Sequence, residues 1–123
     1  GLFRTSDFIS IHCKVTPETT GMIGYDLLSR MKPTAYFINT ARSMIAKEED
    51  IIRILSEHKI AGAALDVFDK EPIGADHPLL KLDNCYILPH IGGATNEVVE
   101  HHSRIITDDI IRFINGDKPI HIL

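Results

Sequence analysis

The stretch IAGAALDVF, residues 60 to 68, is the clearest strand in the sequence and the one that decides the fold. It is almost continuously apolar, and three other runs share this character: DFISIHC at 7 to 13, AYFINTA at 35 to 41 and CYILP at 85 to 89. Runs that lack an alternating polar face are typical of parallel strands in a sheet covered on both faces. We therefore expect four parallel strands.

Helical patterns lie between these runs. GYDLLSRM, at 24 to 31, is followed by Lys32 and Pro33, which stop a helix. KEEDIIRILSEHK, at 47 to 59, opens with acidic residues that suit the positive end of a helix dipole. Strands alternating with helices in this way predict an α/β unit with right-handed crossovers.

A long helix is expected to close the chain, over residues 94 to 115. Thr95 is a suitable N-cap, and Glu97 places a negative charge in the first turn. Gly116 is expected to end the helix as its C-cap.

Length and charge exclude several classes of protein. A chain of 123 residues with 44% hydrophobic content is long enough for one core, and its net charge of −4 argues against a nucleic-acid partner. No apolar run approaches the roughly 18 residues needed to span a bilayer, so we expect no membrane partner. Cys13 and Cys85 lie in or beside apolar runs, as free thiols do in a reducing, cytoplasmic setting.

Polar side chains follow the predicted strands. In parallel α/β sheets ligands bind outside the carboxyl ends of the strands, so these side chains are expected to meet in one crevice. Arginine holds a carboxylate through its planar fork, and a histidine beside a carboxylate can give and take a proton near neutral pH. The residues at these ends are Thr40, Arg42, Asp66, Glu71, His90 and the pair Gly92 and Gly93.

Each of these residues also has an ordinary structural interpretation. On position alone Arg42 suits a surface ion pair, Asp66 a turn cap and Glu71 a loop acid, and His90 suits a structural role. Convergence at one edge of a sheet is what favours a functional site.

The remaining histidines and the cysteines are weaker candidates. His101 and His102 are adjacent, so on a helix they point about 100° apart and cannot both face one metal. We expect His77 to lie in a surface turn, and His58 and His121 show no partner pattern. The cysteines lack the spacing of metal ligands, so no metal site is expected.

Taken together, the sequence resembles the D-isomer-specific 2-hydroxyacid dehydrogenases. The resemblance covers essentially the whole chain in the order of that family, and several motifs together make it specific. It is carried by SDFISIHCKVTPETTGMIG, MKPTAYFINTAR, IAGAALDVFDKEP, HPLLKLDNCYILPHIGGAT and FINGDKP.

The resemblance implies a fold, a reaction and a set of roles. The reaction is an NAD-dependent interconversion of a 2-keto acid and a D-2-hydroxy acid. Arg42 would bind the substrate carboxylate, Glu71 would orient the imidazole, and His90 would be the acid/base. Asp66 would lie near the nicotinamide carboxamide. The nicotinamide half of the cofactor would be lined by Cys13, Lys14, Thr16, Thr40, Asp66, His90, Gly92 and Gly93.

The sequence departs from the family pattern in three places. Lys14 stands where the family commonly has proline, which affects a cofactor contact, and Ser43 stands where it usually has glycine. Serine tolerates a positive φ less well, so the turn beside Arg42 is expected to differ. The fingerprint G-x-G-x-x-G, which grips the pyrophosphate of a dinucleotide, does not occur in the sequence.

The missing fingerprint leads us to expect a partial Rossmann (doubly wound) fold. Residues 1 to 115 would be the second half of an NAD-binding domain, with about four mostly parallel strands plus a long C-terminal helix. Residues 116 to 123 would be a tail returning toward a substrate domain. Such a fragment is expected to be inactive alone and to associate through its exposed strand edge, with a homodimer as the expected form of the enzyme.

Other functions stay open at this stage. Related proteins of this fold act as cofactor-sensing corepressors, and a self-associating fragment without its own function is a third reading. The choice between NAD and NADP depends on the residue that contacts the adenine ribose, which is expected in the other half of the domain.

Overall fold

The chain forms two compact units in the computed structural model, which describes residues 1–121. The first unit is Gly1–His90 and the second is Ile91–Leu123. The first contains every strand and the predicted strand-end residues up to His90. The second contains the long helix.

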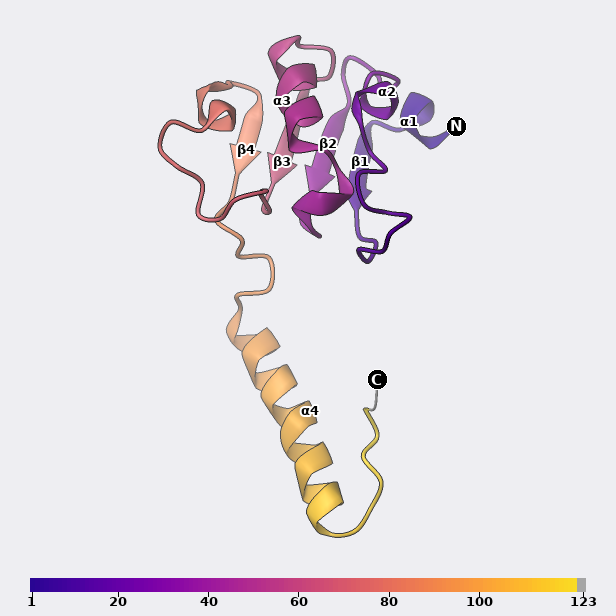
Figure 1. Cartoon of the computed structure of the whole chain (residues 1–123), viewed down its shortest axis with the longest axis vertical. Coiled ribbons are helices and arrows are strands. Elements are labelled where there is room, and N and C mark those ends of the chain that lie inside the picture. Colours follow the sequence, from indigo (N-terminus) through magenta and orange to yellow (C-terminus); the bar gives the residue numbers. More distant parts are fainter. Residues whose placement is uncertain (122–123) are drawn as a thin grey trace. The chain divides into compact units, whose positions relative to one another are not determined.

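A parallel sheet of four strands organises the first unit, in the order β1-β2-β3-β4 (Figure 1). The prediction of four parallel strands is confirmed. Each strand is shorter than the apolar run that predicted it, because the end of each run continues as loop at the carboxyl edge. The strands are β1 (Phe8–Ile11), β2 (Tyr36–Asn39), β3 (Gly62–Leu65) and β4 (Cys85–Ile87).

Short helices precede the first strand and connect the strands. They are α1 (Leu2–Thr5), α2 (Tyr25–Leu28), α3 (Glu48–Ser56) and the 3-10 helices η1 (Ser43–Ile45) and η2 (Pro78–Lys81). The sequence had indicated α2 and α3 within longer spans, and it had not indicated α1, η1 or η2. Three acidic residues occupy the first turn of α3, where they suit the helix dipole. Its buried face is Ile51, Ile54 and Leu55.

The core lies on one face of the sheet. Strand side chains alternate, so Ile9, Phe37 and Leu65 are buried beneath α2 and α3, whose Leu28 and Leu55 are fully buried. The strands follow one another in one direction across the sheet, so right-handed crossovers bring both helices to the same face, in front of the strands in Figure 1.

Within the first unit, the crossovers place no helix on the opposite face of the sheet. Phe8 is 67% exposed and Tyr86 is 66% exposed, and the Phe8 ring stacks on Tyr36 with centroids 5.7 Å apart. Within the first unit, the expectation of a sheet covered on both faces is therefore wrong. The apolar runs had predicted that both faces of the sheet are covered, whereas the crossover helices cover only one face.

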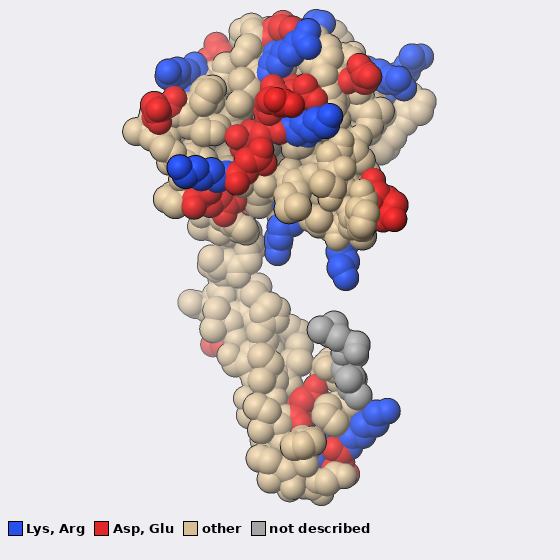
Figure 2. Space-filling model, viewed as in Figure 1, with Lys and Arg blue, Asp and Glu red and all other residues tan. Residues whose placement is uncertain are grey.

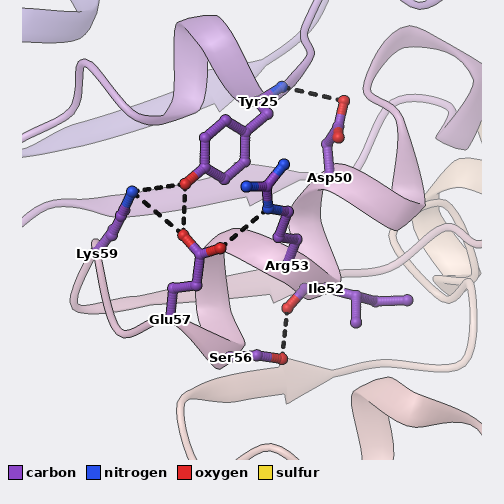
Figure 3. A network of polar contacts seen from close by, with 7 residues as sticks. All are labelled: Tyr25, Asp50, Ile52, Arg53, Ser56, Glu57 and Lys59. Atoms are coloured by element: carbon purple, nitrogen blue, oxygen red, sulfur yellow. Dashed lines mark hydrogen bonds and ion pairs between the residues drawn. The ribbon is translucent and has the colours of Figure 1, made fainter.

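A network of polar contacts joins α2 to the end of α3 (Figure 3). The Tyr25 hydroxyl donates to Glu57 Oε2, Arg53 Nε lies 2.9 Å from Glu57 Oε1, and Lys59 Nζ lies 3.2 Å from Glu57 Oε2. Lys59 also donates to the Tyr25 hydroxyl at 2.6 Å, and Arg53 Cζ lies 4.0 Å from the centre of the Tyr25 ring. Asp50 accepts from the Tyr25 amide at 3.0 Å, so Tyr25, the first residue of α2, is tied to both ends of α3.

The second unit is built on α4 (Asn96–Ile114), as the sequence predicted. Thr95 is the N-cap, and its hydroxyl accepts a hydrogen bond from the Val98 amide at 3.3 Å. Asn115 is the C-cap, and Gly116 follows with a φ of +82°, a conformation that glycine adopts without a Cβ penalty.

The tail after Gly116 is bound back to α4 through Asp109. The carboxylate accepts from the amides of Ile120 at 2.8 Å and His121 at 3.0 Å, and it lies 3.1 Å from His121 Nδ1. These bonds lower the pKa of Asp109, the Ile120 amide most of all. His121 therefore has a partner, contrary to the expectation from sequence. Part of the predicted tail, residues 122 and 123, lies outside the described residues.

Candidate functional site

The strand register brings the predicted strand-end residues to one edge of the sheet. Asn39 of β2 pairs with Leu65 of β3, and Leu65 pairs with Ile87 of β4. The ladder continues one step further, since the Asp66 amide donates to the Asn39 carbonyl at 3.0 Å. Thr40 and Asp66 therefore leave the sheet at the same level. Thr40 is exposed, whereas Asp66 is buried, with 1% of its surface exposed.

Asn39 shapes the turn that presents Arg42. Its side chain is buried at the end of β2, where Oδ1 accepts from the Ala41 amide at 3.1 Å and Nδ2 donates to the Arg42 carbonyl at 3.1 Å. The Arg42 side chain is exposed, and its Nη1 donates to the Ala41 carbonyl at 2.6 Å. Sequence reasoning missed Asn39. The signal available was a polar residue closing a buried strand.

Ser43 does not disturb the turn beside Arg42. It begins η1 directly after Arg42, which has extended backbone with φ −152° and ψ 141°. Among residues 1–121, the non-glycine residues with positive φ are His58 and His90. The loss of glycine at this position therefore carries no backbone strain.

Glu71 and His90 form a hydrogen-bonded pair. Glu71 Oε2 lies 2.6 Å from His90 Nδ1, and Glu71 Oε1 accepts from the Phe68 amide at 2.9 Å. The hydrogen bond to His90, followed by the one from Phe68, lowers the pKa of the Glu71 carboxyl. An ionised Glu71 can only accept, so Nδ1 carries the proton of this bond. Nε2 then lies on the opposite edge of the ring.

The backbone of His90 is unusual. Its φ is +55°, in the left-handed region that histidine visits more readily than branched or bulky residues do. Such conformations concentrate at ligand and active sites, where the surrounding structure holds them. The side chains of His90 and Glu71 remain 44% and 34% exposed, so the pair is open to a small molecule.

An apolar cavity of about 370 Å³ adjoins the pair. Its walls come from the loop after β3, the last residue of β4 and the loop after β4, and are Phe68, Glu71, Pro72, Ile73, Ile87, Pro89 and His90. A larger depression of about 580 Å³ lies beside the N-terminus of α3, and neither Arg42 nor His90 lines it. Because Glu71 and His90 line the smaller cavity, it is the better candidate for a functional site.

His77 is not a simple surface residue, contrary to the expectation from sequence. Its side chain is only 17% exposed, and Nε2 lies 3.1 Å from Glu48 Oε1 at the start of α3. Its Nδ1 accepts from the Leu79 amide at 3.4 Å, which caps η2. The partner lies 29 residues away, so local sequence gave no signal of the contact.

The loop after β1 is held by threonines. The Thr16 amide donates to Thr19 Oγ1 at 2.7 Å, and Thr19 Oγ1 donates to the Lys14 carbonyl at 2.8 Å. The side chain of Lys14 is exposed, and Cys13 and Thr16 are partly buried. The structure thus fixes the backbone of this loop and leaves Lys14 open to solvent.

Gly92 and Gly93 belong to the second unit, and both are exposed. A Cβ built on Gly93 would meet nothing within 4 Å. Burial raises the pKa of the Cys85 thiol to about 11, which leaves it protonated and unreactive at neutral pH.

Residues 1–121 carry neither a metal-binding cluster nor a membrane-spanning helix. No group of three or more His, Cys, Asp or Glu side chains is arranged to hold a metal ion. In the same part of the chain, no helix has the length and apolar character to cross a membrane.

Comparison with known families gives a match over most of the chain. Residues 1–92 match the model of the family "D-isomer specific 2-hydroxyacid dehydrogenase, NAD binding domain". The matched segment includes the whole sheet, Arg42, Glu71 and His90.

Curated relatives agree with this match. A glyoxylate reductase from Thermofilum pendens is 42% identical over 96% of this chain and 35% of its own length. Human glyoxylate reductase/hydroxypyruvate reductase is 41% identical over 94% of this chain and 35% of its own length. The chain thus spans about a third of the length of these relatives.

Solved structures have the same fold. A D-isomer specific 2-hydroxyacid dehydrogenase from Lactobacillus delbrueckii, in its NAD-complexed form, is 28% identical over 98% of this chain and 40% of its own, with a TM-score of 0.88. A dehydrogenase of the same description from Xanthobacter autotrophicus, solved with NADPH, is 30% identical over 96% of this chain and 48% of its own, with a TM-score of 0.81.

Proposed function

The chain belongs to the family of D-isomer specific 2-hydroxyacid dehydrogenases, and from that premise we propose that it supplies the acid/base pair and the carboxylate anchor of an NAD-dependent 2-keto acid reductase. The observation that carries the proposal is the 2.6 Å hydrogen bond between Glu71 and His90 at the carboxyl edge of the sheet. The activity is that of a complete enzyme, and this chain alone is expected to bind NAD weakly and to show no turnover.

The proton would move at His90 Nε2. Glu71 accepts from Nδ1, so its negative charge stabilises the doubly protonated ring and holds it in one orientation. Nε2–H would then donate its proton to the keto oxygen of the substrate. Proton transfer from a positioned group of this kind contributes roughly 10²-fold or more to a rate.

Arg42 would anchor the substrate. Its exposed guanidinium follows β2, and a planar fork of donors matches the two oxygens of a 2-keto acid carboxylate. The Asn39 side chain holds the turn from which Arg42 projects. This arrangement favours a small anionic substrate, in keeping with the names of the glyoxylate and hydroxypyruvate reductases among the relatives.

The same edge of the sheet fits the nicotinamide half of a cofactor. Thr40 presents an exposed polar side chain where β2 ends, and Asp66 lies buried at the same level where β3 ends. Bound NADH supplies the hydride that reaches the keto carbon as the proton reaches its oxygen, and the solved relatives leave NAD and NADP as alternatives. Cys13, Lys14, Thr16, Gly92 and Gly93 are proposed as further cofactor contacts.

Assembly, setting and domain limits are parts of the same proposal. The exposed edge of β1 and the open face around Phe8 and Tyr86 support a homodimer. The free thiols Cys13 and Cys85 support a reducing, cytoplasmic setting. Residues 1 to 115 are proposed as part of the NAD-binding domain, and residues 116 to 123 as a tail toward a substrate domain.

The test is an absorbance assay of NADH oxidation by the complete protein whose reading frame contains these residues. Glyoxylate, hydroxypyruvate and larger 2-keto acids are compared. We expect Arg42→Ala to raise KM strongly and His90→Ala to lower kcat by about 10²-fold or more. His101→Ala, which removes an exposed histidine from α4, is the matched control and should keep the parent rate. An unchanged rate in His90→Ala, or no turnover of any keto acid by the parent, refutes the proposal.

A further inference from the structure

A second carboxylate–histidine pair lies beside the loop that carries Glu71. Glu48, the first residue of α3, uses both of its carboxylate oxygens on this loop. Oε1 lies 3.1 Å from His77 Nε2, and Oε2 accepts from the Asp69 amide at 3.0 Å. The side chains are only 15% and 17% exposed, so the contact is partly shielded from water.

The hydrogen bonds of His77 define its tautomer. Nδ1 accepts from the Leu79 amide, so in the neutral ring the proton sits on Nε2 and is donated to Glu48. Leu79 is fully buried and anchors η2 in the core. His77 therefore links Glu48, at the start of α3, to η2, which Leu79 holds in the core.

Consecutive backbone amides link Glu48 to the acid/base pair. The Phe68 amide donates to Glu71 Oε1, and the next amide, that of Asp69, donates to Glu48 Oε2. A movement that breaks the bond at Asp69 shifts the adjoining peptide, and with it the donor that holds Glu71. Glu71 in turn orients the ring of His90.

The helix itself does not explain this use of Glu48. A carboxylate in the first turn suits the helix dipole wherever its oxygens point. Here both oxygens are engaged by Asp69 and His77 of the β3–β4 connection. A role in the stability of α3 alone would not require these contacts.

We propose that Glu48 and His77 are positioning residues for the reaction, holding the segment 68 to 71 so that Glu71 meets His90. The inference rests on the proposed function for its effect on rate. The geometric coupling of Glu48 to Glu71 stands apart from that function and can be measured without turnover.

The first test is the pKa of the Glu71 carboxyl, measured by ¹³C NMR on the complete protein with labelled glutamate. The resonance is assigned with Glu71→Gln. Glu48→Gln keeps the shape of the side chain but offers one acceptor oxygen to two donors. We expect the pKa of Glu71 to rise toward that of a free glutamate, because its hydrogen bonds to Phe68 and His90 weaken.

Matched variants separate positioning from general stability. Glu57→Gln makes the same change at the other end of α3 and breaks the Tyr25 network, so it should leave Glu71 unchanged. His77→Ala should act like Glu48→Gln. His77→Gln, whose amide can still donate to Glu48, should restore much of the parent behaviour.

The second test is kinetic. Glu48→Gln and His77→Ala should lower kcat by about 10-fold while KM changes by less than about 2-fold, because a misplaced acid/base slows the chemical step more than it weakens binding. A parent protein without reductase activity would refute the proposed function, and the NMR result would still decide the coupling. The positioning role is overturned if the pKa of Glu71 stays at its parent value in both variants, or if Glu57→Gln shifts it equally.

Discussion

Glu71 and His90, 19 residues apart in the chain, are joined by a hydrogen bond of 2.6 Å between Oε2 and Nδ1. The bond links the loop after β3 to the loop after β4. The lowered pKa of Glu71 reports the attraction between the carboxylate and the ring.

The first prediction concerns the charge of Glu71. Glu71→Gln keeps an oxygen that can accept from Nδ1 but removes the negative charge, so the protonated ring loses stabilisation. We expect kcat of keto-acid reduction to fall by about 10-fold or more, and the alkaline limb of the kcat/KM profile to move to lower pH. The profile reports the pair as a unit. If the pH profile of kcat/KM for Glu71→Gln has the same limbs as that of the parent, the electrostatic role of Glu71 is contradicted.

A second prediction concerns acid stability. Hydrogen bonds from Tyr25 and then Arg53 lower the pKa of Glu57 from 4.5 to about 2. A group whose pKa is lowered by folding adds stability above its unfolded pKa and loses it as pH falls through the folded value. The contribution of Glu57 is therefore complete above about pH 4.5 and declines toward pH 2.

The measurement is the Tm of the parent protein and of Glu57→Gln between pH 7 and pH 2. Glutamine resembles the protonated carboxyl, so the difference in Tm should be largest at neutral pH and should close as pH falls. Added salt should reduce it, because these side chains are between 33% and 60% exposed. Acidic and basic side chains lie interspersed on the surface of the first unit (Figure 2). A difference in Tm that stays constant over this range would contradict the assignment.

The sheet and α3 could be predicted because their signals are local. Apolar runs mark the strands, and the spacing of Ile51, Ile54 and Leu55 marks the buried face of the helix. The strand order also follows from short right-handed crossovers. The face left uncovered within the first unit could not be predicted in this way, because an apolar run does not indicate which segment covers a face.

The residues of the candidate site could be predicted from the sequence, whereas the contacts that hold them in place were harder to predict. Strand ends and the family resemblance singled out Arg42, Glu71 and His90 as candidates. The contact of Glu48 was not predictable, since its partner His77 lies 29 residues along the chain. Asn39 bonds within its own turn, to Ala41 and Arg42, and was missed although a polar residue closing a buried strand was a signal. Sequence patterns record periodicity well and such long-range hydrogen bonds poorly.

A third prediction concerns Gly62 at the start of β3. A Cβ at this position would lie 2.7 Å from the Asn84 carbonyl oxygen and 3.1 Å from the Tyr36 ring. The first of these neighbours is backbone and cannot rotate away, so β3 or the chain before β4 would have to shift. We expect Gly62→Ala to lower the free energy of unfolding by about 1–3 kcal/mol, as overpacking does in cores. Chemical denaturation measures this loss, and a stability equal to that of the parent would show that the strands can separate freely here.

The last prediction concerns Gly93, where, in contrast to Gly62, an added Cβ has free space around it. A Cβ at this position meets nothing within 4 Å, so Gly93→Ala should keep the free energy of unfolding within about 0.5 kcal/mol of the parent value. If the backbone at Gly93 is where the cofactor approaches, the added methyl group will occupy space that the ligand needs. Calorimetric titration of the complete protein with NADH should then give a Kd about 10-fold weaker, a loss of about 1.4 kcal/mol. Gly62→Ala is the control with the opposite expectation. It should lower the stability, while the protein that remains folded should bind NADH with the parent affinity. Unchanged NADH affinity in a stable Gly93→Ala protein would remove Gly93 from the proposed cofactor site.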